Sequence, residues 1–208
     1  MQLPLEARDF GMYGGFLATW GYIVAVGRGR AKNMPPWYLL FTMIIFVAIM
    51  GFDGINAFLY DLKFVPHLYT PMLELRLATG LLCGIAFGGI MVPVVNMTLW
   101  QQDDLRPVIE NWKELFILLG LMVILYVLNF SGWGLLFYPL AIITSGSTII
   151  LIALINMVFV ISLARKECTA VTLRDALNPF AVGVALSIVE LGGLSLLRYL
   201  VLGTMVLP

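Results

Sequence analysis

Long apolar stretches alternate with short polar stretches along the whole chain. About 20 consecutive apolar residues are enough for an α-helix to cross a bilayer. The pattern therefore predicts an all-α, polytopic integral membrane protein with about six transmembrane helices. We expect the spans at about residues 10–26, 37–60, 72–100, 112–130, 139–163 and 179–202. We interpret residues 1–208 as one transmembrane helical domain, because no linker or low-complexity tract divides them.

The basic residues outside the predicted spans gather in alternate polar stretches. Those after the first, third and fifth spans contain Arg28, Arg30, Lys32, Arg106, Arg165, Lys166 and Arg174, and Lys113 lies at the start of the fourth span on the same side. The other stretches contain only Arg8 and Lys63. Because cytoplasmic loops are enriched in lysine and arginine, this asymmetry predicts that both termini lie on the outer, non-cytoplasmic side.

The composition supports a membrane protein and argues against a nucleic-acid partner. The chain is 61% hydrophobic and 12% charged, with a mean hydropathy of +0.98, whereas soluble domains carry about 25% charged residues. Twelve basic and twelve acidic side chains give zero net charge. A nucleic-acid-binding surface would need a basic patch, so the bilayer is the partner that the sequence predicts.

The residues that most often carry chemistry are scarce. Cys83 and Cys168 lie far apart, and we interpret them as free thiols, while His67 is the only histidine. The sequence contains no recognisable catalytic triad, phosphate-binding loop or cluster of metal ligands. We therefore predict no catalytic residue, no metal site, no cofactor and no enzyme activity. Whether a lipid or hydrophobic small molecule binds stays open.

Two charged residues fall inside the second and third spans, at similar depths. Asp53 lies about 10 Å, and Arg76 about 6 Å, from the predicted outer ends of their spans, at 1.5 Å per residue. An ionisable side chain in a transmembrane helix is costly unless it is paired or functional. Because helices joined by a short loop are usually neighbours, we predict that Asp53 pairs with Arg76.

Other polar residues extend this set. We predict an intramembrane polar network of Asp53, Asn56, Arg76, Thr79, Glu190 and Arg198, together with the outer-side residues Arg8, Asp9 and Glu74. Near the first three spans, the network is either a set of ion pairs that locks three helices or a small polar pocket. Glu190 lies near mid-membrane, where it could carry a proton, bind a substrate, bond a backbone carbonyl or contact another subunit.

Gly80, Gly84 and Gly88 recur every four residues along the third span, on the same stripe as Arg76. Small residues at this spacing allow two membrane helices to approach closely. We therefore predict that these three glycines form a helix-packing face.

Three short motifs follow one another in the N-terminal part of the chain: Arg8, Gly11, Tyr13, Gly15 and Phe16, then Asp53-Gly54, and then residues 75–80. In these motifs the chain resembles the uncharacterised DUF2085 family of bacterial membrane proteins, over roughly residues 6–95. Glu6 and Asp9 stand where the family has cysteines, so a metal or redox role of those cysteines does not carry over. The resemblance implies a multi-pass protein of the bacterial inner membrane, without an established activity.

Two functional hypotheses follow from this architecture. The first is a non-catalytic subunit that packs into or stabilises a larger membrane complex, for instance a respiratory or photosynthetic one. The alternative is a small-molecule transporter or its membrane substrate-binding component, with Asp53, Arg76 and Glu190 lining a pocket. A membrane enzyme is a third hypothesis that no motif supports.

Overall fold

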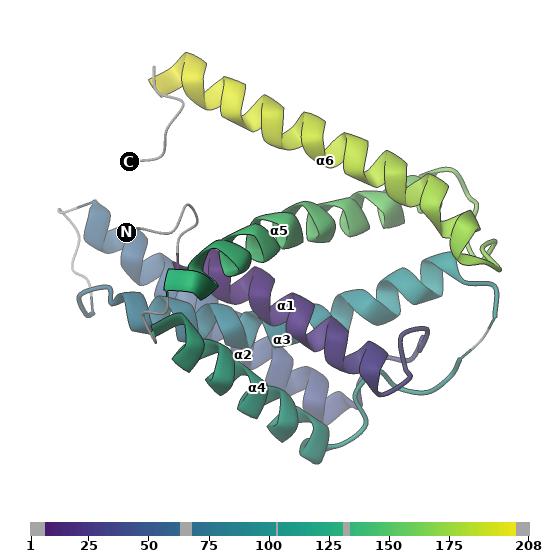
Figure 1. The fold of residues 1–208 in the computed structure, drawn as a ribbon, viewed down its shortest axis with the longest axis horizontal. Helices are drawn as coiled ribbons and strands as arrows, with labels where there is room; N and C mark the ends of the chain where they lie inside the picture. The colour runs from purple at the N-terminus through teal and green to yellow at the C-terminus, as the bar shows by residue number, and fades with distance from the viewer. Residues whose placement is uncertain (1–6, 63–67, 103, 131–133, 203–208) are drawn as a thin grey trace. The chain divides into compact units, whose positions relative to one another are not determined.

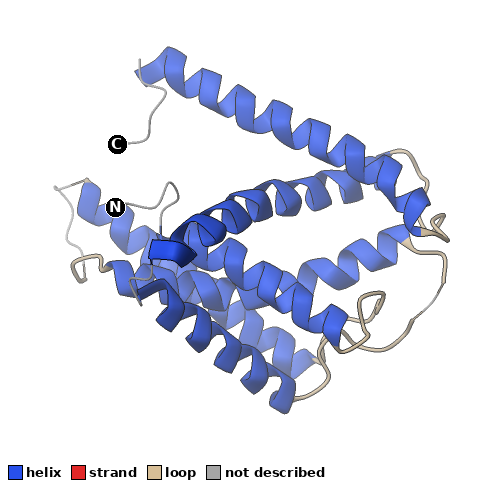
Figure 2. Cartoon of the chain, in the orientation of Figure 1, coloured by secondary structure: helices blue, strands red, loops and turns tan. Residues whose placement is uncertain are grey.

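The computed structural model describes residues 7–62, 68–102, 104–130 and 134–202. Within these ranges the chain forms six α-helices and no strand (Figures 1 and 2). The helices are α1 (Ala7–Ala25), α2 (Trp37–Asp61), α3 (Leu73–Leu99), α4 (Trp112–Phe130), α5 (Gly134–Leu163) and α6 (Leu173–Leu202). The all-α prediction is therefore confirmed for the described residues.

Five of these helices are long and apolar enough to cross a membrane. The qualifying segments are Trp37–Tyr60, Leu73–Leu99, Trp112–Asn129, Thr144–Leu163 and Leu173–Leu200. Helix α1, which corresponds to the predicted span at 10–26, is not among them; Arg8, Asp9 and several glycines dilute its apolar residues. The number of spans and the side on which the termini lie stay predictions.

Two helices begin earlier than the apolar pattern indicates. Helix α5 begins at Gly134 instead of residue 139, and α6 begins at Leu173 instead of residue 179. The carboxylate of Asp175 accepts hydrogen bonds from the backbone N–H of Val171 and of Thr172, which satisfies donors at the start of α6. Hydrogen bonds between the Asp175 side chain and the backbone therefore mark where this helix begins, which is before its first long apolar stretch.

The chain divides into two compact units. Unit 1 comprises Met1–Asn96 and Asp103–Ser147, and unit 2 comprises Met97–Gln102 and Thr148–Pro208. Each is described by itself below. The interpretation of the chain as a single transmembrane domain stays a prediction.

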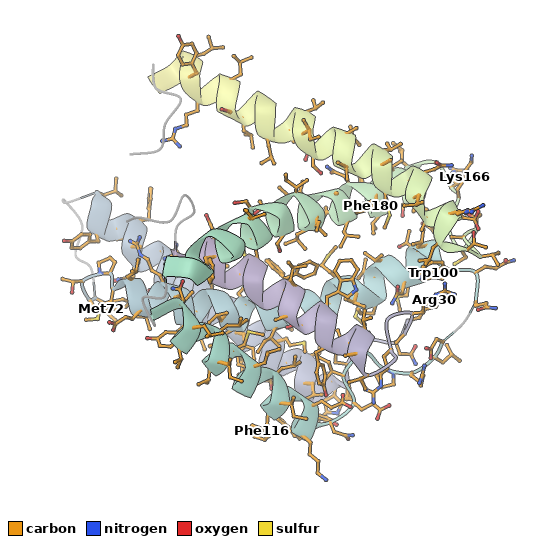
Figure 3. All side chains as sticks on the ribbon, viewed as in Figure 1. Arg30, Met72, Trp100, Phe116, Lys166 and Phe180 are labelled. Atoms are coloured by element: carbon orange, nitrogen blue, oxygen red, sulfur yellow. The ribbon has the colours of Figure 1, made fainter. Side chains whose placement is uncertain are left out.

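Unit 1 has an apolar core and apolar outer surfaces. Its core contains Phe10, Ile23, Leu39, Met43, Leu77, Leu81, Ile85, Ile109, Leu115 and Leu118, all nearly or fully inaccessible. Large apolar side chains also remain exposed on α2 and α4, as Phe116 illustrates at 64% exposure (Figure 3). Exposed apolar surface along a helix of transmembrane length is what contact with lipid tails requires.

Close backbone contact joins α1 to α3 within unit 1 (Figure 1). A Cβ atom added to Gly80 would lie 2.3 Å from the carbonyl oxygen of Arg8, and one added to Gly84 would lie 2.7 Å from Cα of Gly15. One added to Gly88 would lie 2.5 Å from Cγ2 of Thr19. The three predicted packing glycines therefore lie against α1, where a side chain would collide with it.

Unit 2 contains its own helix contact and a backbone bridge. A Cβ atom added to Gly183 of α6 would lie 2.3 Å from the carbonyl oxygen of Ala153 in α5. The backbone of Ala170 accepts a hydrogen bond from Gln101 N–H at 2.9 Å and donates one to Leu99 at 3.0 Å. The segment after α5 is thus hydrogen-bonded to the segment that ends α3.

Candidate functional site

The carboxylate of Asp53 lies inside unit 1 with both oxygens bonded. Asp53 is 2% exposed. Its Oδ2 accepts a hydrogen bond from Nη2 of Arg8 at 2.7 Å, and its Oδ1 accepts one from the hydroxyl of Tyr69 at 2.5 Å. A buried carboxylate is tolerated only when a positive charge and hydrogen-bond donors compensate for the lost water. Arg8 and Tyr69 provide both.

Asn56 lies one turn further along α2 and fixes the chain that precedes α3. Its side-chain amide donates to the carbonyl oxygen of Tyr69 at 2.9 Å, and its Oδ1 accepts from the N–H of Leu68 at 2.9 Å. These two bonds hold the backbone of Tyr69 where its hydroxyl reaches Asp53. We call Arg8, Asp53, Asn56 and Tyr69 the Asp53 clasp, because they tie α1, α2 and the chain before α3 together.

The surroundings of Tyr69 keep its hydroxyl protonated. Burial raises the pKa of Tyr69 to about 12, and the hydrogen bond to Asp53 and its negative charge add to the rise. The positive charges of Arg8 and Arg76 act in the opposite direction. The phenol therefore remains a hydrogen-bond donor to Asp53 throughout the physiological pH range.

The structure gives the sequence-predicted residues near the clasp different surroundings. Arg8, placed in the outer-side set, is an ion-pair partner of Asp53. Arg76 lies close enough to act on Tyr69, and its predicted pairing with Asp53 stays a prediction. The hydroxyl of Thr79 donates to the carbonyl oxygen of Arg76 at 3.1 Å.

The two predicted outer-side carboxylates stand at helix starts. Asp9 lies in the first turn of α1 and is half-buried. Glu74 lies in the first turn of α3 and is exposed. A negative charge near a helix N-terminus interacts favourably with the helix dipole, so both positions have a local structural explanation.

A second ionic cluster, which our sequence analysis did not predict, lies among the loops of unit 1. Arg28 is 9% exposed. Its guanidinium contacts Glu114 at 2.9 Å and Glu110 at 3.2 Å, and the hydrogen bond that it donates to Glu114 is the main reason why the pKa of Arg28 is raised. The amide of Asn96 donates to the carbonyl oxygens of Gly29 and Ala31.

A sequence signal for this cluster exists, although it is weak. Glu110 and Glu114 are four residues apart at the start of α4 and could have been matched with the basic residues at 28–32. The positive-inside rule instead interprets those basic residues as markers of the cytoplasmic side of the membrane. Two carboxylates compensate the charge of Arg28. The residue therefore joins the segment after α1 to the start of α4.

Glu190 belongs to unit 2 and has more open surroundings. Its carboxylate accepts a hydrogen bond from the side-chain amide of Asn156 at 3.0 Å, and Glu190 is exposed. Gly192 and Gly193 beside it have no atom within 4 Å of an added Cβ. Arg198 is half-buried, and its Nε makes no hydrogen bond with a described residue.

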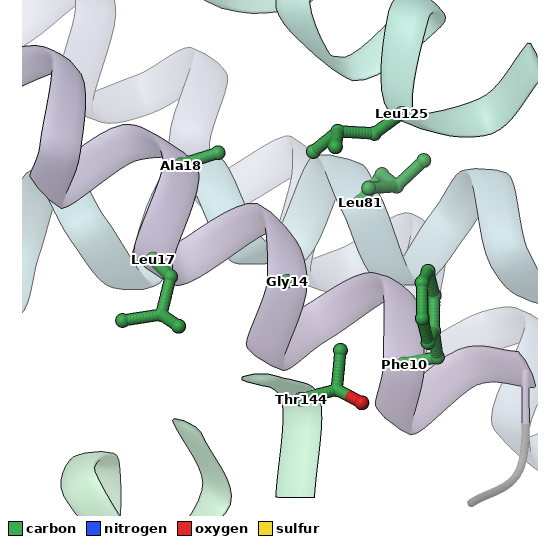
Figure 4. Close-up of a pocket in the computed structure, with 7 residues that line it drawn as sticks. All are labelled: Phe10, Gly14, Leu17, Ala18, Leu81, Leu125 and Thr144. Carbon is green, nitrogen blue, oxygen red and sulfur yellow. The ribbon is translucent and has the colours of Figure 1, made fainter. Parts of the chain in front are cut away.

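The described part of the chain also contains an apolar cavity of about 300 Å³ in unit 1 (Figure 4). Its lining residues are Phe10, Gly14, Leu17, Ala18, Leu81, Leu125 and Thr144. Among the described residues, no three His, Cys, Asp or Glu side chains gather in a way that could hold a metal ion.

The comparisons with known proteins agree with the predicted resemblance. The DUF2085 family, described as a predicted membrane protein, matches residues 1–90. No curated protein and no solved structure matches the chain. This is a membrane protein. The matched region contains the whole Asp53 clasp and Arg76, whereas Glu190 and α4 to α6 lie beyond it.

Proposed function

We propose that this protein is a non-catalytic subunit that packs into a larger complex of the bacterial inner membrane through α6. The observation that carries the proposal is the exposed carboxylate of Glu190 within the span Leu173–Leu200. An intramembrane carboxylate that faces lipid is costly. A transmembrane helix of another subunit that covers Glu190 and offers it a hydrogen-bond donor would remove that cost.

The residues around Glu190 suit a helix–helix contact. Leu186, Glu190, Gly193 and Leu197 follow one another at intervals of four, three and four residues, so they form one stripe of α6. All four are exposed, with Leu186 at 38% and Leu197 at 60%. Small and polar residues are enriched where membrane helices associate. We call these four residues the Glu190 stripe.

The distribution of basic residues supports one membrane orientation for this subunit, and the family match supports its place in a membrane. In this proposal the Arg28 cluster faces the cytoplasm and the Asp53 clasp lies toward the outer surface. Both termini are then outside, as the positive-inside rule predicts. Other integral membrane subunits and the lipid bilayer are the proposed partners.

The alternative function is a small-molecule transporter or its membrane substrate-binding component. That function would use Asp53, Arg76 and Glu190 as pocket residues. The described cavity of unit 1 is lined by neither Asp53 nor Arg76, and both oxygens of Asp53 are bonded to protein groups. These observations favour the subunit proposal.

The test places a photo-crosslinking residue on the Glu190 stripe in native membranes. The crosslinker replaces Gly193 in one variant and Ile188, which is 59% exposed, in the control. Ile188 is two residues from Glu190, so it projects from the opposite side of the helix.

We expect the crosslinker at residue 193, and not at residue 188, to capture one protein that also co-purifies in a mild detergent at stoichiometric amounts. The capture should fail in a Glu190→Ala background. Recovery of a lone 23.1 kDa chain, with only lipid adducts at both positions, would overturn the proposal and favour the transporter alternative.

A further inference from the structure

The cavity in unit 1 lies beside the close contact between α1 and α3. It is bordered by α1, α3, α4 and the part of α5 that belongs to unit 1. Its volume of about 300 Å³ is at the lower end of the range for small-ligand pockets. Figure 4 shows Thr144 facing Gly14 of α1, with Leu81 and Leu125 on another part of the wall.

The cavity is elongated along α1. Phe10, Gly14, Leu17 and Ala18 lie at intervals of four, three and one residues, so they share a side of the helix and extend over about 12 Å at 1.5 Å per residue. Gly14, Leu17 and Ala18 are half-buried, whereas Phe10 is buried. The most accessible part of the lining on α1 is thus at Gly14, Leu17 and Ala18, and its most buried part is at Phe10.

The missing side chain of Gly14 leaves much of this space. A Cβ atom added there would meet only Cγ2 of Thr144, at 3.6 Å, which is ordinary van der Waals contact. By contrast, Gly11 and Gly15 on the same helix are pressed against α3. Gly14 is thus a glycine whose packing partner is not another backbone, so a larger residue can enter the cavity without displacing a helix.

The lining selects a hydrocarbon ligand. Six of the seven lining residues present only apolar atoms or a bare backbone, and Thr144 carries the single hydroxyl. A polar or charged molecule would lose its hydration without receiving hydrogen bonds in return. A lipid tail forms no hydrogen bonds with water, so it loses none when it enters the cavity. Lipid tails also already surround membrane-spanning helices.

We propose that this cavity binds one acyl chain of a phospholipid, which enters beside Leu17 and Ala18 and extends toward Phe10. The chain fills a space that would otherwise leave the cavity wall without van der Waals contacts. Its headgroup stays outside the cavity, because the lining offers no charge to bind it. This site is independent of the Glu190 stripe and of the proposed subunit role.

The test fills the cavity and measures retained lipid. Gly14→Leu places a branched side chain in the cavity, and Ala18→Leu does so from the neighbouring turn. Gly21→Leu is the matched control, since Gly21 is exposed and an added Cβ there would meet no atom within 4 Å. Each full-length protein is equilibrated with palmitoyl-oleoyl-phosphatidylglycerol in detergent, washed, checked by size-exclusion chromatography and measured by native mass spectrometry.

We expect the wild type and Gly21→Leu to retain one phospholipid per chain, and Gly14→Leu and Ala18→Leu to lose most of it. If Gly14→Leu does not fold, Ala18→Leu decides the result. Equal retention by all proteins, or none by the wild type, would overturn the proposal. Recovery of an isoprenoid molecule in the lipid's place from native membranes would overturn the assignment to an acyl chain.

Discussion

Asp53 and Glu190 are two carboxylates in helices of transmembrane length, and their surroundings differ sharply. Asp53 is 2% exposed and both its oxygens are bonded, to Arg8 and Tyr69. Glu190 is exposed, and one hydrogen bond, from Asn156, is described for it. The first carboxylate is satisfied within its own unit, which indicates a structural role. The second retains capacity for a group outside the chain, which is why we place the proposed subunit contact there.

The largest expected difference between the two carboxylates concerns stability. Asp53→Ala leaves the guanidinium of Arg8 without its partner, and removal of one member of a buried pair costs about 3–5 kcal/mol. Glu190→Ala removes an exposed group and should leave stability almost unchanged. The apparent melting temperature in detergent, followed by fluorescence-detected size-exclusion chromatography, measures both. Equal destabilisation by the two substitutions would show that the comparison is wrong.

A pair of double variants then identifies the arginine that matters to Asp53. Replacing a buried ion pair by apolar residues of similar size is often neutral or even stabilising. Asp53→Leu with Arg8→Met should therefore recover much of the stability that Asp53→Leu loses. Asp53→Leu with Arg76→Met should recover less. The reverse order would establish the Asp53–Arg76 pair that the sequence predicts.

Arg8 and Arg76 show which neighbours of Asp53 can be predicted from the sequence and which cannot. Asp53 stands out because it interrupts an apolar stretch, and the hairpin between α2 and α3 points to Arg76 as its neighbour. Arg8 is 45 residues away from Asp53 in the chain. Its position depends on α1 packing against α3, which no local pattern specifies. Tyr69 was also missed, since a hydrogen bond from Asn56, 13 residues earlier in the chain, is what positions its backbone toward Asp53.

The helices, and the position of a glycine stripe on one of them, are easier to read from the sequence. Apolar length specifies a span directly, and glycines at intervals of four residues form a stripe whatever the partner helix is. By contrast, the Arg28 cluster depends on loop conformation, where side chains such as Asn96 bond to backbone carbonyls. Local periodicity contains no information about such contacts.

The third prediction concerns Tyr69, which lies before α3 and bonds to Asp53. Tyr69→Phe removes one hydrogen bond to a charged group, worth about 1.5–3 kcal/mol, and should lower the melting temperature less than Asp53→Ala does. The pKa of Tyr69 is raised from an ordinary value of 10 to about 12 in the folded protein. Its contribution to stability is therefore complete below pH 10 and disappears as the pH rises toward 12.

A pH series of melting temperatures checks this prediction. The difference in melting temperature between the wild type and Tyr69→Phe should be constant from pH 6 to 9 and should shrink above about pH 10. A difference that stays unchanged up to about pH 12 would mean that the phenol is not bonded to Asp53 as described.

The fourth prediction extends the comparison to glycines near the two carboxylates. In Gly80→Ala the new Cβ would lie 2.3 Å from the carbonyl oxygen of Arg8, so the backbones of α1 and α3 must separate. Overpacking of this kind typically costs about 1–3 kcal/mol. Gly192→Ala meets no atom within 4 Å and replaces glycine in a helix, so it should be neutral or slightly stabilising. Thermal melts of the two variants test this, and a destabilising Gly192→Ala would contradict the open surroundings of α6.

The smallest expected effect on stability is that of Glu190→Gln, and it discriminates between partners. The substitution keeps an oxygen that can accept the hydrogen bond from Asn156, so the melting temperature of the isolated protein should not change. If a partner helix approaches Glu190 with a cationic side chain, loss of the negative charge should weaken co-purification strongly. If the partner offers a neutral donor, co-purification should persist with Gln and fail with Leu. Persistence with both Gln and Leu would remove Glu190 from the proposed contact, and the contrast with Asp53 would then reflect only a difference in burial.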